Sequence, residues 1–214
     1  MMKPAVNLLL LSVWVLGFGL SLTLLGLRQS FAQESGRPVS PPSWVLTQLP
    51  SIGFTGQGSL RFLGLVIYDA VLYTPAKARP EALLRQPLAL TLTYKMGFSG
   101  QSIAQRSIEE MRRLRRGDSR QQEAWLAQMQ AIFPDVARGD ELTGLHLPGQ
   151  GARFFFNGRL VGRIDDPVFS EAFFSIWLDP ETREPGLRQA LLSGLDRQPN
   201  IRSGPSVVPE RVGR

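Results

Sequence analysis

The spacing of apolar and polar residues predicts strands in the first part of the folded region. Residues 58–73 are dense in β-branched and aromatic side chains, and the pair Thr74 and Pro75 predicts the end of this extended segment. Gly64 within it predicts a bend or a bulge. Residues 88–96 alternate between apolar and polar side chains, as a half-buried strand does.

Two helices are predicted after these strands. The first, over residues 99–116, has one apolar arc that predicts packing on the sheet. The arc contains Ile103, Ala104, Ser107, Ile108, Met111 and Leu114. Ser102 with Gln105 three residues later predicts a capping box at its start. The second helix is predicted over residues 119–133, between a Gly-Asp break and Pro134.

The remainder of the folded region predicts more strands and then two more helices. Strands are predicted over residues 139–164, with a tight hairpin turn at Asn157 and Gly158. Asp166 and Pro167 predict the start of a helix, and a last short helix follows residue 184. This order predicts one α+β domain over residues 44–195, with helices on one face of a largely antiparallel sheet.

Both ends of the chain differ from this domain in composition. Residues 8–27 are almost wholly apolar and follow a single charge at Lys3, and Ser30 and Ala32 fit the two small residues before a cleavage site. Residues 1–32 therefore predict a signal peptide, with an uncleaved membrane anchor as the alternative. The domain is accordingly expected to be exported to the periplasm. If the segment is not cleaved, it would anchor the domain to the inner membrane. Residues 33–43 predict a Pro-rich linker, and residues 196–214 a disordered basic tail.

Composition narrows the chemistry that the domain can perform. The chain has 214 residues, a net charge of +6, no cysteine and one histidine, His146. Disulfides, thiol catalysis and sites rich in cysteine or histidine are therefore excluded, and no metal is predicted. Without a glycine-rich phosphate loop we expect no nucleotide cofactor. His146 is expected on a strand, facing solvent or bonded to a neighbour, and a catalytic role is the weaker alternative.

The arginines of the first predicted helix are expected to form a solvated face. They lie outside the apolar arc, and Glu109 precedes Arg113 by four residues, the favourable order for a surface ion pair. No aromatic residue interleaves them, so nucleic acid is not an expected partner. Association with an anionic membrane surface remains an alternative. Glu110 falls at the edge of the arc and is a candidate for partial burial beside Arg106.

Several segments resemble the bacterial chalcone isomerase-like domain. They are GQGSLRFLGLVIYDAVLYTP from residue 56, FSGQSIAQRSIEEM from residue 98, GARFFFNGRLVGRIDDPVFSEAFFSIWLDP from residue 151, and the final helix near residues 184–192. The resemblance implies an open-faced β-sandwich, a large antiparallel sheet with a layer of helices. It also implies one of two activities, because plant members are either cofactor-free isomerases of chalcones or non-catalytic proteins that bind fatty acids.

The positions that resemble the isomerase site carry different residues in this chain. Such isomerases use an arginine, a strand threonine, and a tyrosine and an asparagine on a helix. By the resemblance, Leu63 stands at the place of the threonine, Ile103 at that of the tyrosine and Glu110 at that of the asparagine. Residues 50–59 contain no arginine, and Arg61 is the nearest one. Loss of such polar groups removes transition-state stabilisation, so chalcone cyclisation is not expected.

The leading hypothesis is therefore an exported, non-catalytic domain that binds an apolar small molecule, such as a fatty acid, in a cleft between sheet and helices. The expected ligand-binding residues are Arg61, Leu63, Tyr68, Tyr73, Tyr94, Ile103 and Glu110. Strand parity separates Arg61 from Tyr68 unless Gly64 marks a bulge. Two alternatives remain: an isomerase or lyase with Glu110 as general base, and a cell-envelope interaction module without a ligand.

Overall fold

The structure, a computed structural model, describes residues 40–195. The predicted signal peptide or anchor over residues 1–32 and the predicted tail over residues 196–214 lie outside this range, as does most of the predicted linker. Within residues 40–195, no helix combines the length and the hydropathy that crossing a bilayer requires.

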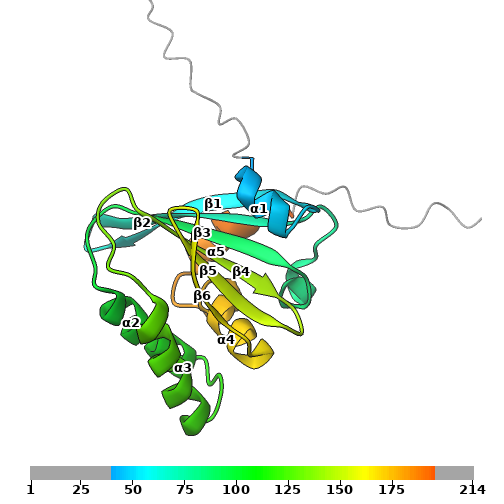
Figure 1. The fold of residues 1–214 in the computed structure, drawn as a ribbon. Helices are drawn as coiled ribbons and strands as arrows, with labels where there is room; N and C mark the ends of the chain where they lie inside the picture. The colour runs from blue at the N-terminus through cyan, green and yellow to red at the C-terminus, as the bar shows by residue number, and fades with distance from the viewer. Residues whose placement is uncertain (1–39, 196–214) are drawn as a thin grey trace, which may run out of the picture. The chain divides into compact units, whose positions relative to one another are not determined.

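Six antiparallel strands form a single sheet in which every strand pairs with its neighbours in chain order (Figure 1). The strands are β1 (Ile52–Phe62), β2 (Leu65–Pro75), β3 (Leu88–Tyr94), β4 (Glu141–Leu147), β5 (Gly151–Phe156) and β6 (Arg159–Ile164). This up-and-down order makes β1 and β6 the two edges of the sheet. The chain folds as the α+β open sheet that its sequence pattern predicts.

Two-residue turns with positive φ close the hairpins at both edges of the sheet. Leu63 and Gly64 have φ values of 48° and 83°, and Asn157 and Gly158 have values of 48° and 78°. Such backbone angles match the right-handed twist of the flanking strands. The turn at Asn157 is confirmed. Gly64, however, lies in a turn between two strands and not in a bend within one long strand.

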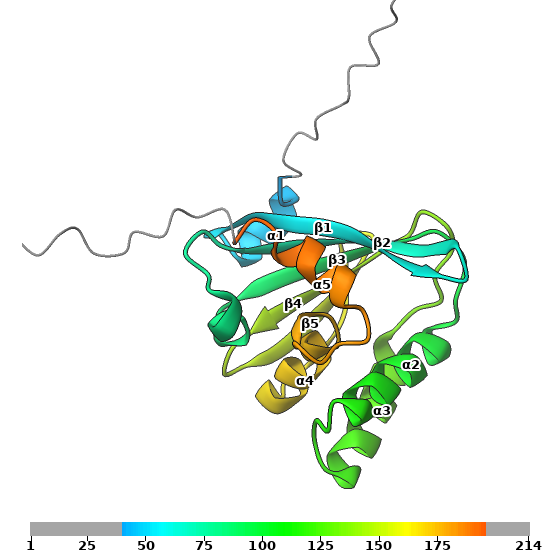
Figure 2. The same cartoon turned by 180° about the vertical axis from the view of Figure 1, so that it is seen from behind.

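The larger helices cover one face of the sheet (Figures 1 and 2). They are α2 (Gly100–Arg113), α3 (Ser119–Ile132), α4 (Pro167–Leu178) and α5 (Pro185–Leu192). Helix α4 packs on β4 and β5, α5 on β1 and β2, and α3 on β6, whereas α2 packs mainly on α3 and α4. The predicted apolar arc of α2 is therefore buried mostly against other helices, and its expected packing on the sheet is wrong in that respect.

Side chains at the helix starts satisfy the backbone N–H groups that have no partner within the helix. The Asp166 carboxylate accepts hydrogen bonds from the N–H groups of Val168 and Phe169, as the sequence predicts for α4. Helix α2 differs from the prediction, because Ser99 is its cap and accepts from the N–H of Ser102 at 3.1 Å. The capping box occurs instead at the start of α3, between Asp118 and Gln121.

The opposite face of the sheet is partly covered by a short helix that the sequence analysis did not predict. Helix α1 (Ser43–Gln48) brings Val45 and the neighbouring Leu49 onto this face, where they pack with Tyr73, Leu145 and Phe155. The Trp44 and Phe155 rings lie with their centroids 4.5 Å apart. A 3-10 helix, η1 (Pro80–Arg85), completes the elements of the domain.

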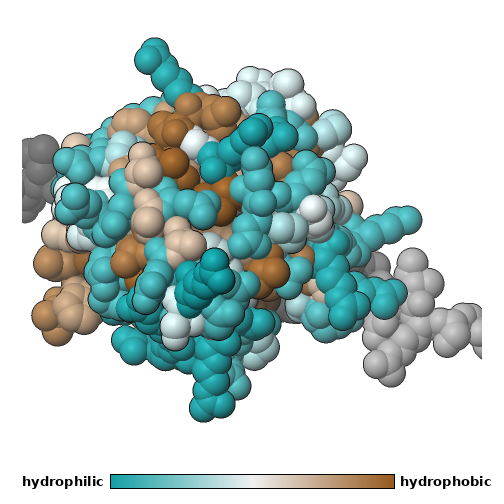
Figure 3. Space-filling view, turned by 60° about the horizontal axis from the view of Figure 1, so that its bottom comes forward, coloured by the Kyte–Doolittle hydropathy of each residue, from teal (hydrophilic) through white to brown (hydrophobic). Residues whose placement is uncertain are grey.

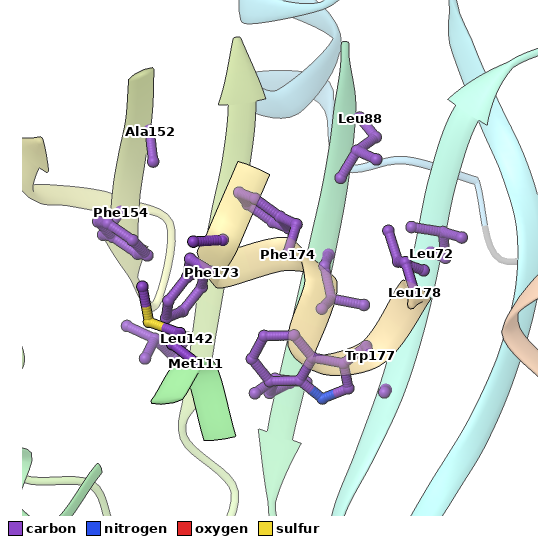
Figure 4. Packing of buried hydrophobic residues seen from close by; sticks show 14 of the residues in the cluster. Leu72, Leu88, Met111, Leu142, Ala152, Phe154, Phe173, Phe174, Trp177 and Leu178 are labelled. Carbon is purple, nitrogen blue, oxygen red and sulfur yellow. The ribbon is translucent and has the colours of Figure 1, made fainter. Parts of the chain in front are cut away.

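The main core lies between the sheet and α4. Phe173, Phe174 and Trp177 of this helix point toward β3, β4 and β5, and Met111 of α2 meets Phe173 from the side (Figure 4). The Phe154 and Phe173 rings pack edge to face with centroids 5.1 Å apart. Burial of each such side chain stabilises the fold by about 1.5–3 kcal/mol. Helix α4 therefore fixes the distance between the helical layer and the sheet.

His146 is a buried residue of this core and is not exposed to solvent. Its Nδ1 lies 2.6 Å from the Ser170 hydroxyl, and its Nε2 lies 2.7 Å from the Leu84 carbonyl oxygen. Since a carbonyl can only accept, Nε2 carries the hydrogen and Nδ1 accepts from Ser170. Ser170 is itself fully buried, so the pair cannot reach a substrate. Of the two earlier interpretations, the bonded histidine is correct and the solvent-facing one is wrong.

This arrangement predicts that the protein loses stability in mild acid. Burial holds the pKa of His146 below its usual value of 6.5, although the Leu84 carbonyl and Glu171 oppose the effect. Above pH 6.5 both folded and unfolded chains are neutral at this residue, whereas below it only the unfolded chain gains a proton. The free energy of unfolding should therefore fall by up to about 1.4 kcal/mol per pH unit below pH 6.5.

Denaturant titrations of the wild type and of His146→Gln between pH 7.5 and 5.5 provide the measurement. The variant should be less stable at pH 7.5 and should show a flatter pH profile, because the chain has no other histidine. Parallel profiles for the two proteins would show that His146 does not cause the acid sensitivity.

Candidate functional site

A cavity of about 470 Å³ opens between α2, α4 and the end of the sheet that carries the β1–β2 turn. Most of its lining surface is apolar, and the apolar residues are Leu60, Phe62, Ile67, Leu92, Phe98, Ile103, Leu142, Phe173, Ile176 and Trp177. Its polar lining consists of Arg61, Tyr68, Tyr94, Ser102, Arg106, Ser107, Glu110, Thr182, Arg183 and Glu184. This composition is typical of a small-molecule site, in which a few polar groups orient an apolar ligand.

An irregularity in β2 brings two consecutive residues to the cavity. Leu60 pairs with Tyr68, but the next residue, Arg61, pairs with Val66, which leaves Ile67 as the extra residue of a bulge. Ile67 and Tyr68 both line the cavity as a result. Arg61 and Tyr68 thus reach the same cavity, and the bulge that breaks the strand parity lies at Ile67 and not at Gly64.

Tyr68 and Tyr94 form an aromatic pair in the cavity wall. Their rings pack edge to face with centroids 5.9 Å apart, and the Tyr68 hydroxyl accepts a hydrogen bond from Trp177 Nε1 at 2.9 Å. Burial raises the pKa of Tyr68 to about 12 and raises that of Tyr94 as well. Both hydroxyls therefore stay protonated at neutral pH and can donate a hydrogen bond to an acceptor in the cavity.

Glu110 is the buried carboxylate of the cavity, with a side chain only 9% exposed. Arg113 Nε donates to its Oε2 at 2.8 Å, while Arg106 Nη2 and Arg183 Nε lie 2.8 and 3.5 Å from its Oε1. The approach of Arg106 lacks hydrogen-bond alignment, since Oε1 has no hydrogen-bond partner within residues 40–195. The predicted pair with Arg106 exists, and two further arginines join it.

The surroundings of Glu110 link α2 to the segment between α4 and α5. Arg113 also donates to the Glu181 carbonyl at 2.8 Å, and Arg116 pairs with Asp179 at the end of α4. Glu109 instead lies 3.7 Å from Arg106 and accepts from Gln105. The expected surface pair of Glu109 with Arg113 is therefore wrong, because Arg113 turns toward the buried carboxylate.

Arg61 is the cavity arginine without a carboxylate partner. Among residues 40–195, no acidic side chain lies within 4.0 Å of it, whereas Arg106 and Arg183 both approach Glu110. Its side chain is exposed at the edge strand β1 and contributes to the rim of the cavity. An unpaired guanidinium of this kind is suited to an anionic group on a ligand, because it can donate two parallel hydrogen bonds.

Two of the predicted site residues lie outside the cavity. Leu63 is at the tip of the β1–β2 turn, where its side chain is 87% exposed. Tyr73 points to the opposite face of the sheet and packs with residues of α1, because five residues separate it from Tyr68 and alternation places them on opposite faces. The expectation that Leu63 and Tyr73 line the same cleft as Tyr68 is therefore wrong.

The cavity also contains residues that the sequence analysis did not assign to it. Phe173 and Trp177 of α4 are among them, and Arg106 was expected only as part of a solvated face. Thr182, Arg183 and Glu184 come from the segment between α4 and α5, for which the sequence offers no periodic signal. No three acidic or histidine side chains within residues 40–195 converge as metal ligands would.

We expect Glu110 to stabilise the fold, a role that the variant Glu110→Ala tests directly. Removal of its carboxylate leaves Arg113 without its charged partner, which should reduce the free energy of unfolding by about 1–3 kcal/mol. Glu109→Ala, at the adjacent and half-exposed position, should change it by less than about 0.5 kcal/mol. Chemical denaturation measures both. Equal effects of the two variants would contradict a structural role for Glu110.

Three comparisons place this chain among known proteins. A solved structure of a fatty-acid binding protein from Arabidopsis thaliana superposes with a TM-score of 0.54 at 14% sequence identity, over 66% of this chain and 87% of that one. At that identity the likeness concerns the fold alone. An uncharacterized protein of Haemophilus influenzae is 35% identical over 107 residues. That match covers 50% of this chain and 52% of the relative, so the chain spans about half of that protein's length.

The third comparison covers most of the described domain. The sequence model described as "Chalcone isomerase-like" matches residues 41–193, which extend from the start of α1 through the last helix. The match includes every strand of the sheet and all the elements that surround the cavity. The chain therefore belongs to the chalcone isomerase-like family.

Proposed function

We propose that the domain binds an apolar small molecule with an acidic head group, such as a fatty acid, and performs no reaction on it. The observation that carries the proposal is the 470 Å³ cavity, with its apolar lining and its arginines at the rim. Its size lies within the range of about 300–1,000 Å³ that small-molecule sites occupy. The fold likeness to a fatty-acid binding protein supports the same ligand class.

The polar groups of the cavity favour an anionic head group. Arg61 supplies a cation without a carboxylate partner among residues 40–195, and the protonated hydroxyls of Tyr68 and Tyr94 supply neutral donors. The hydroxyls of Ser107 and Thr182 already donate to backbone carbonyls, so they contribute less to recognition. A carboxylate only accepts hydrogen bonds when ionised, which matches a set of donors.

The enzymatic alternative assigns Glu110 as a general base. A general base has to lie in the cleft that holds the substrate, and Glu110 is buried in the wall of the cavity. However, three guanidinium groups lie within 3.5 Å of its two oxygens, so the carboxylate is already engaged in ion pairs and its access to a substrate proton is limited. At the position that resembles the isomerase tyrosine, Ile103 offers no donor to a ketone. A binding role fits these residues better.

The alternative of an interaction module without a ligand would fit a solid core better than an open cavity. Aromatic side chains of α4 fill the space above β4 and β5, but beside them the cavity remains open next to β2 and α2. An unfilled apolar cavity sacrifices van der Waals contacts, and its retention is more easily explained when a ligand restores them.

We further propose that the domain acts outside the cytoplasm, on the basis of the apolar N-terminal segment.

The first experiment identifies the ligand. The protein is purified from the compartment in which it resides, and native mass spectrometry is followed by extraction of any bound molecule. A stoichiometric acyl-chain or similar apolar mass would support the proposal and define the ligand class. A mass equal to the bare chain, unchanged after addition of fatty acids, would overturn it.

The head-group contact predicts a selective effect of Arg61→Gln. Loss of a charge-assisted hydrogen bond should weaken the binding of a long-chain fatty acid about tenfold or more. The fatty alcohol of the same length carries no charge, so its affinity should change little. Arg112→Gln, on the exposed side of α2, is the matched control and should leave both affinities unchanged. An equal loss for acid and alcohol would contradict the role of Arg61.

The cavity itself is tested by a substitution that fills it. Ile103 lines the cavity from α2, and Ile103→Trp should occupy space that the acyl chain needs and lower the affinity for acid and alcohol alike, by about tenfold or more. Val168→Trp, at the exposed start of α4, controls for the added indole. Calorimetric titration measures both variants, and undiminished binding by Ile103→Trp would place the ligand elsewhere.

A further inference from the structure

The turn between β1 and β2 carries an exposed apolar cluster, which we name the hairpin tip and define as Phe62, Leu63 and Leu65. Their exposed fractions are 64%, 87% and 59%. Three of the six large apolar side chains that are exposed within residues 40–195 therefore belong to a single turn. Figure 3 shows apolar side chains gathered at the left edge of the molecule, the side on which Figure 1 places this turn. Exposed clusters of this kind usually mark a contact surface.

The conformation of the turn offers no folding reason for a leucine at its tip. Leu63 has a φ of 48°, a left-handed conformation that favours asparagine, aspartate or glycine. The turn between β5 and β6 has closely similar φ values and uses Asn157 and Gly158. Leu63 thus costs stability through its backbone and gains none through burial, so a function outside folding is the better explanation for it.

The charged side chains of the cavity beside the hairpin tip are three arginines and two glutamates, Glu110 and Glu184, a net positive charge that an anionic surface would attract. Arg61 precedes the tip and has no acidic partner within 4.0 Å among residues 40–195. Arg106 and Arg183, with side chains 61% and 54% exposed, line the same cavity as Arg61. Arginines beside exposed apolar side chains suit the interface of a bilayer, where anionic head groups lie above the acyl chains.

The cavity opens beside the hairpin tip. Arg61 and Phe62 belong to both, since they line the cavity while they flank the turn. A tip that entered the head-group layer would bring the cavity mouth to the depth at which acyl chains begin. A turn also protrudes, so it can enter a fluid interface without the matching hollow that a protein partner would have to provide.

We propose that the hairpin tip docks the domain onto an anionic lipid bilayer, with Phe62, Leu63 and Leu65 inserted at the interface and Arg61 against the head groups. The proposal goes beyond ligand binding, because it concerns a surface and not the contents of the cavity. Either one can therefore fail while the other stands.

The absence of cysteine allows a single fluorescent label to report on the tip in the full chain. Leu65→Cys is coupled to an environment-sensitive dye. The labelled protein is mixed with phosphatidylcholine vesicles that either contain about 30% of the anionic lipid phosphatidylglycerol or lack it. We expect a blue shift and a several-fold rise in emission only with the anionic vesicles. A label at Gln150→Cys is the control, because Gln150 is exposed in the β4–β5 turn at the opposite end of the strands.

Both labelled proteins retain the apolar N-terminal segment, so any binding through that segment is common to them. A blue shift at both positions, at neither, or equally with neutral vesicles would overturn the proposal. A shift at Leu65→Cys that grows with protein concentration in the absence of lipid would also overturn it, and would assign the tip to contact between copies of the chain.

Leu63→Asn is the decisive variant, because it copies the residue of the other hairpin turn. It should preserve or raise the stability of the domain, since asparagine tolerates positive φ. In the Leu65→Cys background it should reduce the affinity for anionic vesicles about tenfold, through the loss of one inserted side chain. Arg61→Gln should weaken the dependence on phosphatidylglycerol. Unchanged vesicle affinity for Leu63→Asn would overturn the insertion of the tip.

Discussion

The packing of α4 on the sheet is the contact on which the rest of this structure depends. Phe169 and Phe173 stack on the same side of the helix, and Phe173 meets Phe154 of β5 edge to face. Trp177, one turn further, donates to the Tyr68 hydroxyl of β2. The first contacts exclude water over the centre of the sheet, and the last one closes the wall of the cavity. One helix thus connects the stability of the core to the shape of the site.

The cavity exists because the helical layer covers the sheet incompletely. Helix α4 lies over β4 and β5, and α5 lies over β1 and β2, while α2 is displaced onto α3 and α4. The space that remains is bordered by α2, by the segment between α4 and α5, and by the bulged part of β2. Glu110 and its arginines hold the first two of these borders together. Charged residues of α2 that the sequence pattern assigns to a solvated surface therefore stabilise the walls of the cavity.

The two proposals, ligand binding and membrane docking, concern the same end of the sheet. The groups suited to an acidic head group, above all Arg61, lie at the same end of the sheet as the exposed turn at Leu63. An apolar ligand is sparingly soluble in water, so exchange at a bilayer interface would avoid its free passage through solvent.

The sequence by itself determined the class of fold and many of its elements. Alternation along residues 88–96, the Asn157–Gly158 turn and the acidic cap at Asp166 are local signals, and local backbone energetics settle them. The same holds for the apolar arc of α2. The spacing of its apolar residues determines which face of the helix is buried, whether that face packs on the sheet or on other helices.

Only the tertiary structure decided which side chains share the cavity. A single extra residue at Ile67 changes the face that β2 presents, and no local preference marks where such a bulge will form. The turn at Leu63 was missed because leucine is not a turn residue, and the structure places it there against its backbone preference. Arg183 reaches Glu110 across 73 positions of the chain, a meeting set by the packing of α4. Contacts of this kind depend on how whole elements dock, and that information is not local to any segment.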